Sequence, residues 1–274
     1  MLNKKSPIGF FDSGYGGLTV LSDVRKVLPE YDYLYLGDNA RAPYGTRSFE
    51  VVYEYTWECV KELLDRGCDL VVVACNTASA KALRTIQQVN LLDYPGKRVL
   101  GVIRPSAEVI GNYSKSNHIG VLATEGTVNS NSYILEIQKF FPELVVHQHA
   151  CPLWVPLIEN NEFNSDEGQG FIKRDINKLL EKSARIDTLI LGCTHYPILL
   201  NLIKQFLPAH VEVLSQGPII ASSLKQYLLR HTWLVKKLST KQQIHFLTTE
   251  STVEFDANVK RMFGLDIKSE HIKL

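Results

Sequence analysis

Asp69-Leu-Val-Val-Val-Ala-Cys75-Asn-Thr-Ala-Ser79 is a short apolar run that ends in a cysteine and then turns polar. A second stretch, Asp187-Thr-Leu-Ile-Leu-Gly-Cys193-Thr-His-Tyr-Pro197, follows the same pattern. In both, an aspartate stands six positions before the cysteine and a small polar residue follows it. A short apolar run of this kind is typical of a fully buried strand in a parallel sheet. The two stretches therefore predict two equivalent strands, each with a thiol at its carboxyl end.

Apolar runs and segments of helical period alternate along the rest of the chain. Such alternation predicts βα units and a parallel sheet covered on both faces. The predicted strands span 7–11, 31–36, 70–74, 99–103, 118–122, 144–147, 188–191, 211–214 and 244–248. The predicted helices span 18–28, 48–66, 77–91, 127–141, 166–182, a segment ending at Pro208, 219–229 and 253–262.

The alternation restarts after the turn Tyr94-Pro-Gly-Lys97, which indicates an internal repeat. Ile8-Gly-Phe-Phe-Asp-Ser-Gly-Tyr-Gly16 resembles Ile119-Gly-Val-Leu-Ala-Thr-Glu-Gly126, and the two cysteine stretches are offset by nearly the same distance. We predict an α/β fold of two similar doubly wound, parallel-sheet domains, related by pseudo-two-fold symmetry, with the active site between them. The first domain comprises 1–97 plus 210–274, and the second, 98–209, is inserted in it. Chance similarity between βα units is the alternative.

Composition excludes several classes of function. Lys+Arg number 30 against Asp+Glu 29, without a long block of like charges, which argues against nucleic-acid or membrane-surface binding. No run approaches the ~20 apolar residues of a membrane span, or the pattern of a signal peptide. The five cysteines lack the paired spacing of a disulfide scaffold or a zinc knuckle. A reducing cytosol, and hence a cytoplasmic location, is expected.

The polar residues after the predicted strands indicate where a ligand binds. In parallel α/β sheets ligands bind beyond the carboxyl ends of the strands, where Cys75, Cys193, Ser13 and Thr124 are expected. A helix N-terminus after a thiol lowers its pKa and also attracts a carboxylate. If the two domains face each other, one thiol lies on each side of a shared cleft. Acid–base groups on both sides of a bound molecule are what inversion of a carbon centre by proton transfer requires, so the pattern favours a racemase.

Five motifs then carry a resemblance to a known family, from about Ile8 to Ala221. They occur in order and at matching spacing: Asp12-Ser-Gly-Tyr-Gly-Gly17, Pro43-Tyr-Gly45, Cys75-Asn-Thr-Ala-Ser79, Ala123-Thr-Glu-Gly-Thr127 and Gly192-Cys-Thr-His-Tyr-Pro197. The chain resembles glutamate racemase, of the cofactor-independent aspartate/glutamate racemase family. These enzymes interconvert L- and D-glutamate and supply D-glutamate for bacterial peptidoglycan.

The resemblance implies a set of functional residues. Cys75 and Cys193 are the expected catalytic acid/bases, with Asp12 beside the first, His195 beside the second, and the carboxylate of Glu159 near the second. No cofactor or metal is implied, and a homo-oligomer, a dimer, is expected. One departure is Ser215-Gln-Gly217, where family members often have Asp-Ser-Gly. Substrate binding is expected from Asp12, Ser13, Tyr44, Gly45, Asn76, Thr77, Thr124, Thr127, Thr194 and His195.

Other interpretations of the same residues stay open at this point. A cysteine at the end of an apolar strand is by default a small core residue, and Cys59 and Cys68 are expected to be so. Cys193 and His195 form part of a metal site only if further ligands join them. The motif starting at Asp12 lacks the lysine of a phosphate-binding loop. Aspartate as substrate and a dithiol redox protein are further alternatives, and DNA gyrase binding, known for some glutamate racemases, has no support in the near-neutral charge.

Overall fold

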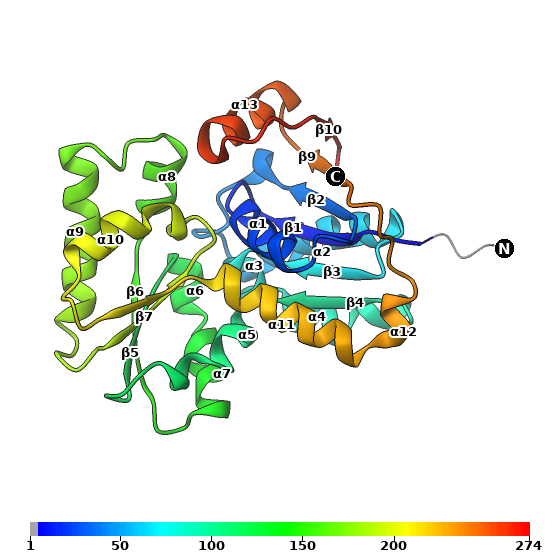
Figure 1. Cartoon of the computed structure of the whole chain (residues 1–274). Helices are drawn as coiled ribbons and strands as arrows, with labels where there is room; N and C mark the ends of the chain where they lie inside the picture. The colour runs from blue at the N-terminus through cyan, green and yellow to red at the C-terminus, as the bar shows by residue number, and fades with distance from the viewer. Residues whose placement is uncertain (1–4) are drawn as a thin grey trace.

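The structure is a computed structural model, and it describes residues 5–274; the first four residues of the predicted first domain lie outside this range. Two sheets form its framework (Figure 1). We call the six-stranded sheet with its helices the first lobe, and the four-stranded sheet with its helices the second lobe. The first sheet has the order β10-β9-β2-β1-β3-β4, from Ser269–His271, Ile244–Thr248, Tyr33–Gly37, Ile8–Asp12, Leu70–Val73 and Arg98–Gly101. The second has the order β6-β5-β7-β8, from Val145–Ala150, His118–Ala123, Thr188–Gly192 and Glu212–Leu214.

The two sheets repeat one topology. Every strand pairing between these named strands is parallel, and the order β2-β1-β3-β4 in the first sheet has the same form as β6-β5-β7-β8 in the second. Strands β3 and β7, which precede the two cysteines, occupy equivalent positions. The predicted fold class is confirmed, and β9 and β10 extend only the first sheet.

Both faces of the first sheet are covered by helices. Phe10 packs with α1 (Gly17–Val27), α11 (Gln216–Arg230) and α13 (Thr252–Phe263) on one face. The next residue, Phe11, packs with α2 (Phe49–Asp65), α3 (Asn76–Lys81) and α4 (Leu83–Gln88) on the other. Successive strand residues point to opposite faces, so a strand covered on both faces must be apolar throughout. This is why β1 and β3 read as continuous apolar runs.

The second lobe is built in the same way. Its sheet packs against α5 (Ile103–Ala107) and α7 (Ser132–Phe140) on one face. The other face packs against α8 (Trp154–Glu159), α9 (Asp166–Leu180) and α10 (Leu200–Phe206). The remaining helical elements are α6 (Glu125–Asn129), α12 (Thr232–Val235), η1 (Asn39–Arg41), η2 (Asn90–Asp93), η3 (Ile110–Asn112) and η4 (Tyr196–Leu199). Within residues 5–274, no helix is both long and apolar enough to cross a bilayer.

The chain crosses between the lobes later than the predicted boundaries 1–97, 98–209 and 210–274 place it. Strand β4 pairs with β3 in the first sheet, and β8 pairs with β7 in the second. Each sheet thus completes its fourth strand before the chain leaves it. The turn Tyr94-Pro-Gly-Lys97 joins two elements of one lobe. The actual crossings are the segments that begin with α5 and α11, and in Figure 1 α11 leads from between the lobes along the first sheet.

Several predicted elements differ in detail. The helix predicted over 77–91 is three short elements, α3, α4 and η2. The helix predicted over 127–141 is interrupted at Asn131, whose left-handed φ of 55° is a conformation that asparagine tolerates better than most residues. The strand predicted over 99–103 ends at Gly101, and Ile103 begins α5. Helix α8 and strand β10 were not predicted.

Candidate active site

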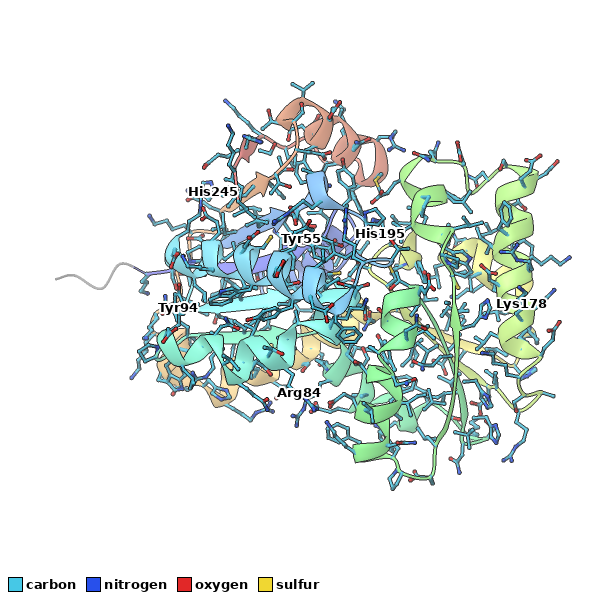
Figure 2. All side chains as sticks on the ribbon, turned by 180° about the vertical axis from the view of Figure 1, so that it is seen from behind. Tyr55, Arg84, Tyr94, Lys178, His195 and His245 are labelled. Carbon is cyan, nitrogen blue, oxygen red and sulfur yellow. The ribbon has the colours of Figure 1, made fainter. Side chains whose placement is uncertain are left out.

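A cavity of about 130 Å³ lies between the two lobes, at the carboxyl ends of their strands. Residues that directly follow β1, β3, β5 and β7 line it, as the fold predicts for a parallel sheet. His195 marks its position between the lobes in Figure 2. The predicted site residues that line the cavity are Ser13, Tyr44, Gly45, Cys75, Asn76, Thr77, Thr124, Glu159, Cys193, Thr194 and His195.

Two predicted site residues, Asp12 and Thr127, lie behind the wall of the cavity. Asp12 is fully buried and accepts hydrogen bonds from the Gly14 N–H (3.0 Å) and the Thr194 hydroxyl (3.3 Å). Burial raises the pKa of Asp12, although the charge of His195 and these hydrogen bonds oppose the shift. Thr127 is also fully buried. Its hydroxyl lies 3.1 Å from that of Thr124, so both residues contact groups that line the cavity.

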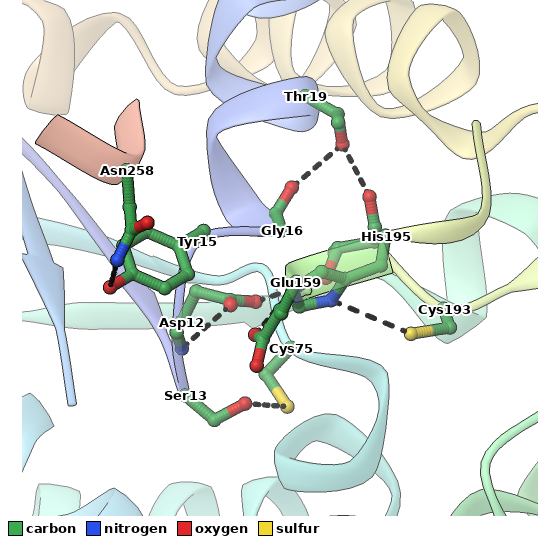
Figure 3. A network of polar contacts seen from close by, with 12 residues as sticks. Asp12, Ser13, Tyr15, Gly16, Thr19, Cys75, Glu159, Cys193, His195 and Asn258 are labelled. Carbon is green, nitrogen blue, oxygen red and sulfur yellow. Dashed lines mark hydrogen bonds and ion pairs between the residues drawn. The ribbon is translucent and has the colours of Figure 1, made fainter. Parts of the chain in front are cut away.

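Cys75 lies on the first-lobe side and caps the N-terminus of α3. Its sulfur accepts a hydrogen bond from the Ala78 N–H (3.4 Å) and lies 3.4 Å from the Ser13 hydroxyl (Figure 3). Burial raises the pKa of the Cys75 thiol to about 12, and the negative charge of Asp12 acts in the same direction. The sulfur therefore carries a proton at neutral pH.

Cys193 lies on the second-lobe side, and a histidine and a carboxylate lie beyond it in a row. Its sulfur is 3.9 Å from His195 Nδ1, and His195 Nε2 is 3.0 Å from Glu159 Oε1 (Figure 3). Burial lowers the pKa of His195, but hydrogen bonds to Cys193 and Glu159 outweigh it and raise the pKa to about 10. The ring is therefore an imidazolium at neutral pH, and such a cation stabilises negative charge that develops on a neighbouring sulfur.

The loop after β1 packs tightly against the loop after β7. A Cβ atom built on Gly16 would lie 2.3 Å from Thr194 Oγ1 and 2.5 Å from His195 Nδ1, so any side chain there would displace both. Thr19 Oγ1 donates to the Thr194 carbonyl (2.9 Å), and this bond also joins the two lobes. The first lobe therefore helps to position the histidine of the second.

Threonine hydroxyls from both lobes meet at another wall of the cavity. Thr77 Oγ1 lies 2.9 Å from Thr124 Oγ1, which lies 3.1 Å from Thr127 Oγ1. Next to them the Gly45 carbonyl accepts from the Gly126 N–H (2.7 Å). These groups supply hydrogen-bond donors on both sides of the boundary between the lobes.

The Tyr44 hydroxyl is engaged in a hydrogen bond within the protein. Its hydroxyl donates to the buried carboxylate of Asp38, and the ring is 1% exposed. Asp38 also accepts hydrogen bonds from Arg41 Nε (2.7 Å) and from the Thr249 hydroxyl (2.8 Å). Asp38 therefore anchors the loop that carries Tyr44 and Gly45 into the cavity wall.

Sequence reasoning missed part of the site. Asp38 directly follows β2, so the rule that found Ser13 would also have found it. The apolar wall of Pro152, Val155 and Pro156 comes largely from α8, a helix too short to show helical periodicity. The lining residues that were not predicted are Gly14, Ala42, Pro43, Thr46, Glu125, Pro152, Val155 and Pro156.

The surroundings of the five cysteines bear on whether each is a core residue, a metal ligand or a catalytic group. All five cysteines are free thiols, and Cys59, Cys68 and Cys151 are buried in hydrophobic clusters and do not line the cavity. Across the described part of the chain, no three His, Cys, Asp or Glu side chains are grouped as metal ligands would be.

Comparison with known proteins gives the family. A family model described as Asp/Glu/hydantoin racemase matches residues 19–224. A glutamate racemase from Listeria monocytogenes is 41% identical over 273 residues, which cover 98% of this chain and 99% of that relative. The chain belongs to the Asp/Glu/hydantoin racemase family. It is an amino-acid racemase, an isomerase, and the predicted resemblance is confirmed.

Solved structures of family members match over the whole chain. A glutamate racemase isoform from Bacillus anthracis is 36% identical with a TM-score of 0.90, covering 99% of this chain and 98% of that one. The glutamate racemase from Francisella tularensis, solved in complex with D-glutamate, is 30% identical with a TM-score of 0.87 and 98% coverage of both chains. The arrangement of two parallel sheets in this racemase is therefore that of its family.

Proposed function

We propose that this racemase interconverts L- and D-glutamate by proton transfer between the substrate and two thiols, and that it supplies D-glutamate for peptidoglycan synthesis in the cytoplasm. The observation that carries the proposal is the placement of Cys75 and Cys193. They follow equivalent strands of the two lobes and line one cavity. The glutamate racemases among its relatives support glutamate as the substrate.

The chemistry needs one base and one acid on opposite faces of the α-carbon. By resemblance, the Cys75 thiol first gives its proton to Asp12, whose pKa burial raises, and the thiolate so formed removes the α-proton of D-glutamate. The electron pair of the broken C–H bond stays on the α-carbon. The Cys193 thiol then delivers a proton to the other face, which gives L-glutamate. The reverse reaction exchanges the two roles. Asp12 assists the first thiol and His195 the second, so the mechanism calls on no cofactor.

The cavity offers polar groups that match an acidic amino acid. Hydroxyls of Ser13, Thr77, Thr124 and Thr194 can donate to carboxylates, and no Lys or Arg side chain is among the described residues that line the wall. Binding groups at two ends of a small cavity fix the distance between the two carboxylates. Aspartate, which is one methylene shorter, would leave one end unpaired, so glutamate should have the higher kcat/KM.

Circular dichroism of purified protein with each enantiomer tests the proposal. After exhaustive dialysis against a chelator, and without pyridoxal phosphate, the signal of either enantiomer should decay to zero. A strict requirement for pyridoxal phosphate or zinc would contradict the mechanism. Equal specificity constants for glutamate and aspartate would favour the alternative substrate, and unchanged glutamate with thiols that cycle with a reductant would favour the redox alternative. The homodimer stays a prediction, which analytical ultracentrifugation tests.

A further inference from the structure

A closed ring of three buried side chains lies behind Asn76, the residue that follows Cys75. Asn76 Nδ2 donates to Gln216 Oε1 (2.6 Å), Gln216 Nε2 donates to the Tyr133 hydroxyl (2.8 Å), and that hydroxyl donates to Asn76 Oδ1 (2.8 Å). Their exposed fractions are 2%, 3% and 0% for Asn76, Gln216 and Tyr133. Because the donors all point the same way around the ring, the three bonds polarise one another.

A backbone carbonyl sets the direction of the ring. The Val102 carbonyl can only accept, and it lies 3.2 Å from Gln216 Nε2. Ser106 Oγ lies 2.9 Å from the same nitrogen and uses its own hydrogen on the Val102 carbonyl (3.1 Å). The Gln216 nitrogen must therefore face these two groups, which share one of its two hydrogens, while the other goes to the Tyr133 hydroxyl. This turns the Gln216 oxygen towards Asn76. Asn76 must in turn present Nδ2 to that oxygen.

The ring joins the two lobes at the point where the chain crosses between them. Asn76 begins α3 in the first lobe, and Tyr133 lies on α7 in the second. Gln216 is the first residue of α11, the returning crossing, and Val102 precedes α5, the outgoing one. Asn76 also lines the cavity, whereas Gln216 does not. Gln216 can influence the cavity only through the residues that it holds.

We propose that Gln216 is a positioning residue of the racemase: it fixes the orientation of the Asn76 amide and thereby ties the Cys75 side of the cavity to the second lobe. The inference rests on the proposed function of this cavity. With the ring intact, the Asn76 amide keeps one hydrogen and one acceptor position, in fixed directions, for a bound substrate. Without Gln216, the amide can flip and present oxygen where its N–H stood.

The test replaces ring members singly and together. Gln216→Met keeps the length of the side chain and removes both polar ends, and Tyr133→Phe removes the hydroxyl alone. Each should lower kcat/KM for glutamate about tenfold to a hundredfold, because a buried partner loses its hydrogen bond. The primary isotope effect with 2-deuterated D-glutamate, which reports the Cys75 step, should rise, and that with 2-deuterated L-glutamate should fall. The double variant should lose little more than either single one, because both break the same ring.

Ser106→Ala is the matched control, since it removes a partner of Gln216 outside the ring. It should leave kcat/KM within about twofold of wild type, because the other partners of Gln216 remain. The inference is overturned if Gln216→Met and Tyr133→Phe lower both isotope effects equally, if their losses add in full, or if Ser106→Ala matches them. If Gln216→Met does not fold, Tyr133→Phe and the control decide. Failure of the proposed function is distinct, because wild-type protein would then leave both enantiomers unchanged.

Discussion

The two sides of the cavity have the same backbone and different chemistry. Cys75 and Cys193 follow equivalent strands, β3 and β7. A buried carboxylate, Asp12, acts on the first thiol, whereas an imidazolium, His195, lies beside the second and is held by Glu159. Repetition of the fold places the two thiols, but separate side chains set the charge around each one. The two thiols therefore occupy equivalent positions in the fold, but the groups beside them differ in charge.

The two thiols lie in different charge environments at neutral pH. The pKa of about 12 for Cys75 keeps a proton on the first-lobe sulfur at neutral pH. A positive charge lies beside the second-lobe sulfur over the same range, because the pKa of His195 is about 10. The two half-reactions thus start from different charge states, and each should respond to its own set of substitutions.

The largest expected effect comes from either thiol. Cys75→Ser or Cys193→Ser nearly keeps the size of the side chain but makes it a far weaker acid. Each variant should therefore fold and lose about a hundredfold to ten-thousandfold in racemisation rate. Circular dichroism at fixed protein concentration measures the loss. Cys68→Ser, a buried thiol outside the cavity, is the control and should stay within about twofold of wild type.

The next effect separates the two assisting groups. Asp12→Asn and His195→Asn should each lower kcat/KM by about tenfold to a hundredfold. Because the two enantiomers have equal free energy, kcat/KM must fall by the same factor for D- and L-glutamate. The separate roles of Asp12 and His195 are therefore measured by isotope effects. The effect with 2-deuterated D-glutamate should rise in Asp12→Asn, and that with 2-deuterated L-glutamate in His195→Asn. Normal activity with only a lowered melting temperature would instead assign both residues a structural role.

The smallest effect is on stability and concerns the Cys193 side alone. The pKa of His195 is raised from 6.5 to about 10, so the folded protein holds a proton that the unfolded chain releases within this window. The free energy of unfolding should therefore decrease as the pH rises from about 6.5 to about 10. Glu159→Gln removes one group that raises this pKa. The drop in melting temperature across this pH range should therefore be smaller in the variant than in wild type, by roughly 2–4 °C. Parallel melting curves across this pH range would show that Glu159 does not act on His195.

The strands and thiols were predictable because their signals are local. A strand buried on both faces must be apolar throughout, so β3 and β7 stand out in the sequence, and each thiol follows within two residues. Helix α8 and the break at Asn131 were missed, because a six-residue helix shows too little periodicity and a left-handed residue depends on its neighbours. The domain boundaries were displaced because a turn within one lobe looks like a junction between lobes.

Contacts between distant residues were beyond the reach of the sequence pattern. The departure at Ser215-Gln-Gly217 is visible in the sequence, but one partner of Gln216 is Asn76, 140 positions away. The anchoring of Tyr44 by Asp38 depends likewise on a loop whose path the sequence does not specify. Such side chains make their hydrogen bonds only after the lobes have packed, so the sequence pattern does not indicate their roles.

Exchange of the α-hydrogen in deuterated water tests the central claim most directly, because it follows each thiol alone. In Cys193→Ser the intact Cys75 should exchange the α-hydrogen of D-glutamate faster than that of L-glutamate, and in Cys75→Ser the preference should reverse. Proton NMR of each enantiomer, with each variant, gives the four rates. Opposite preferences in the two variants are the result that the two-thiol account predicts. The same preference in both, or interconversion of the enantiomers by either variant at nearly the wild-type rate, would contradict it.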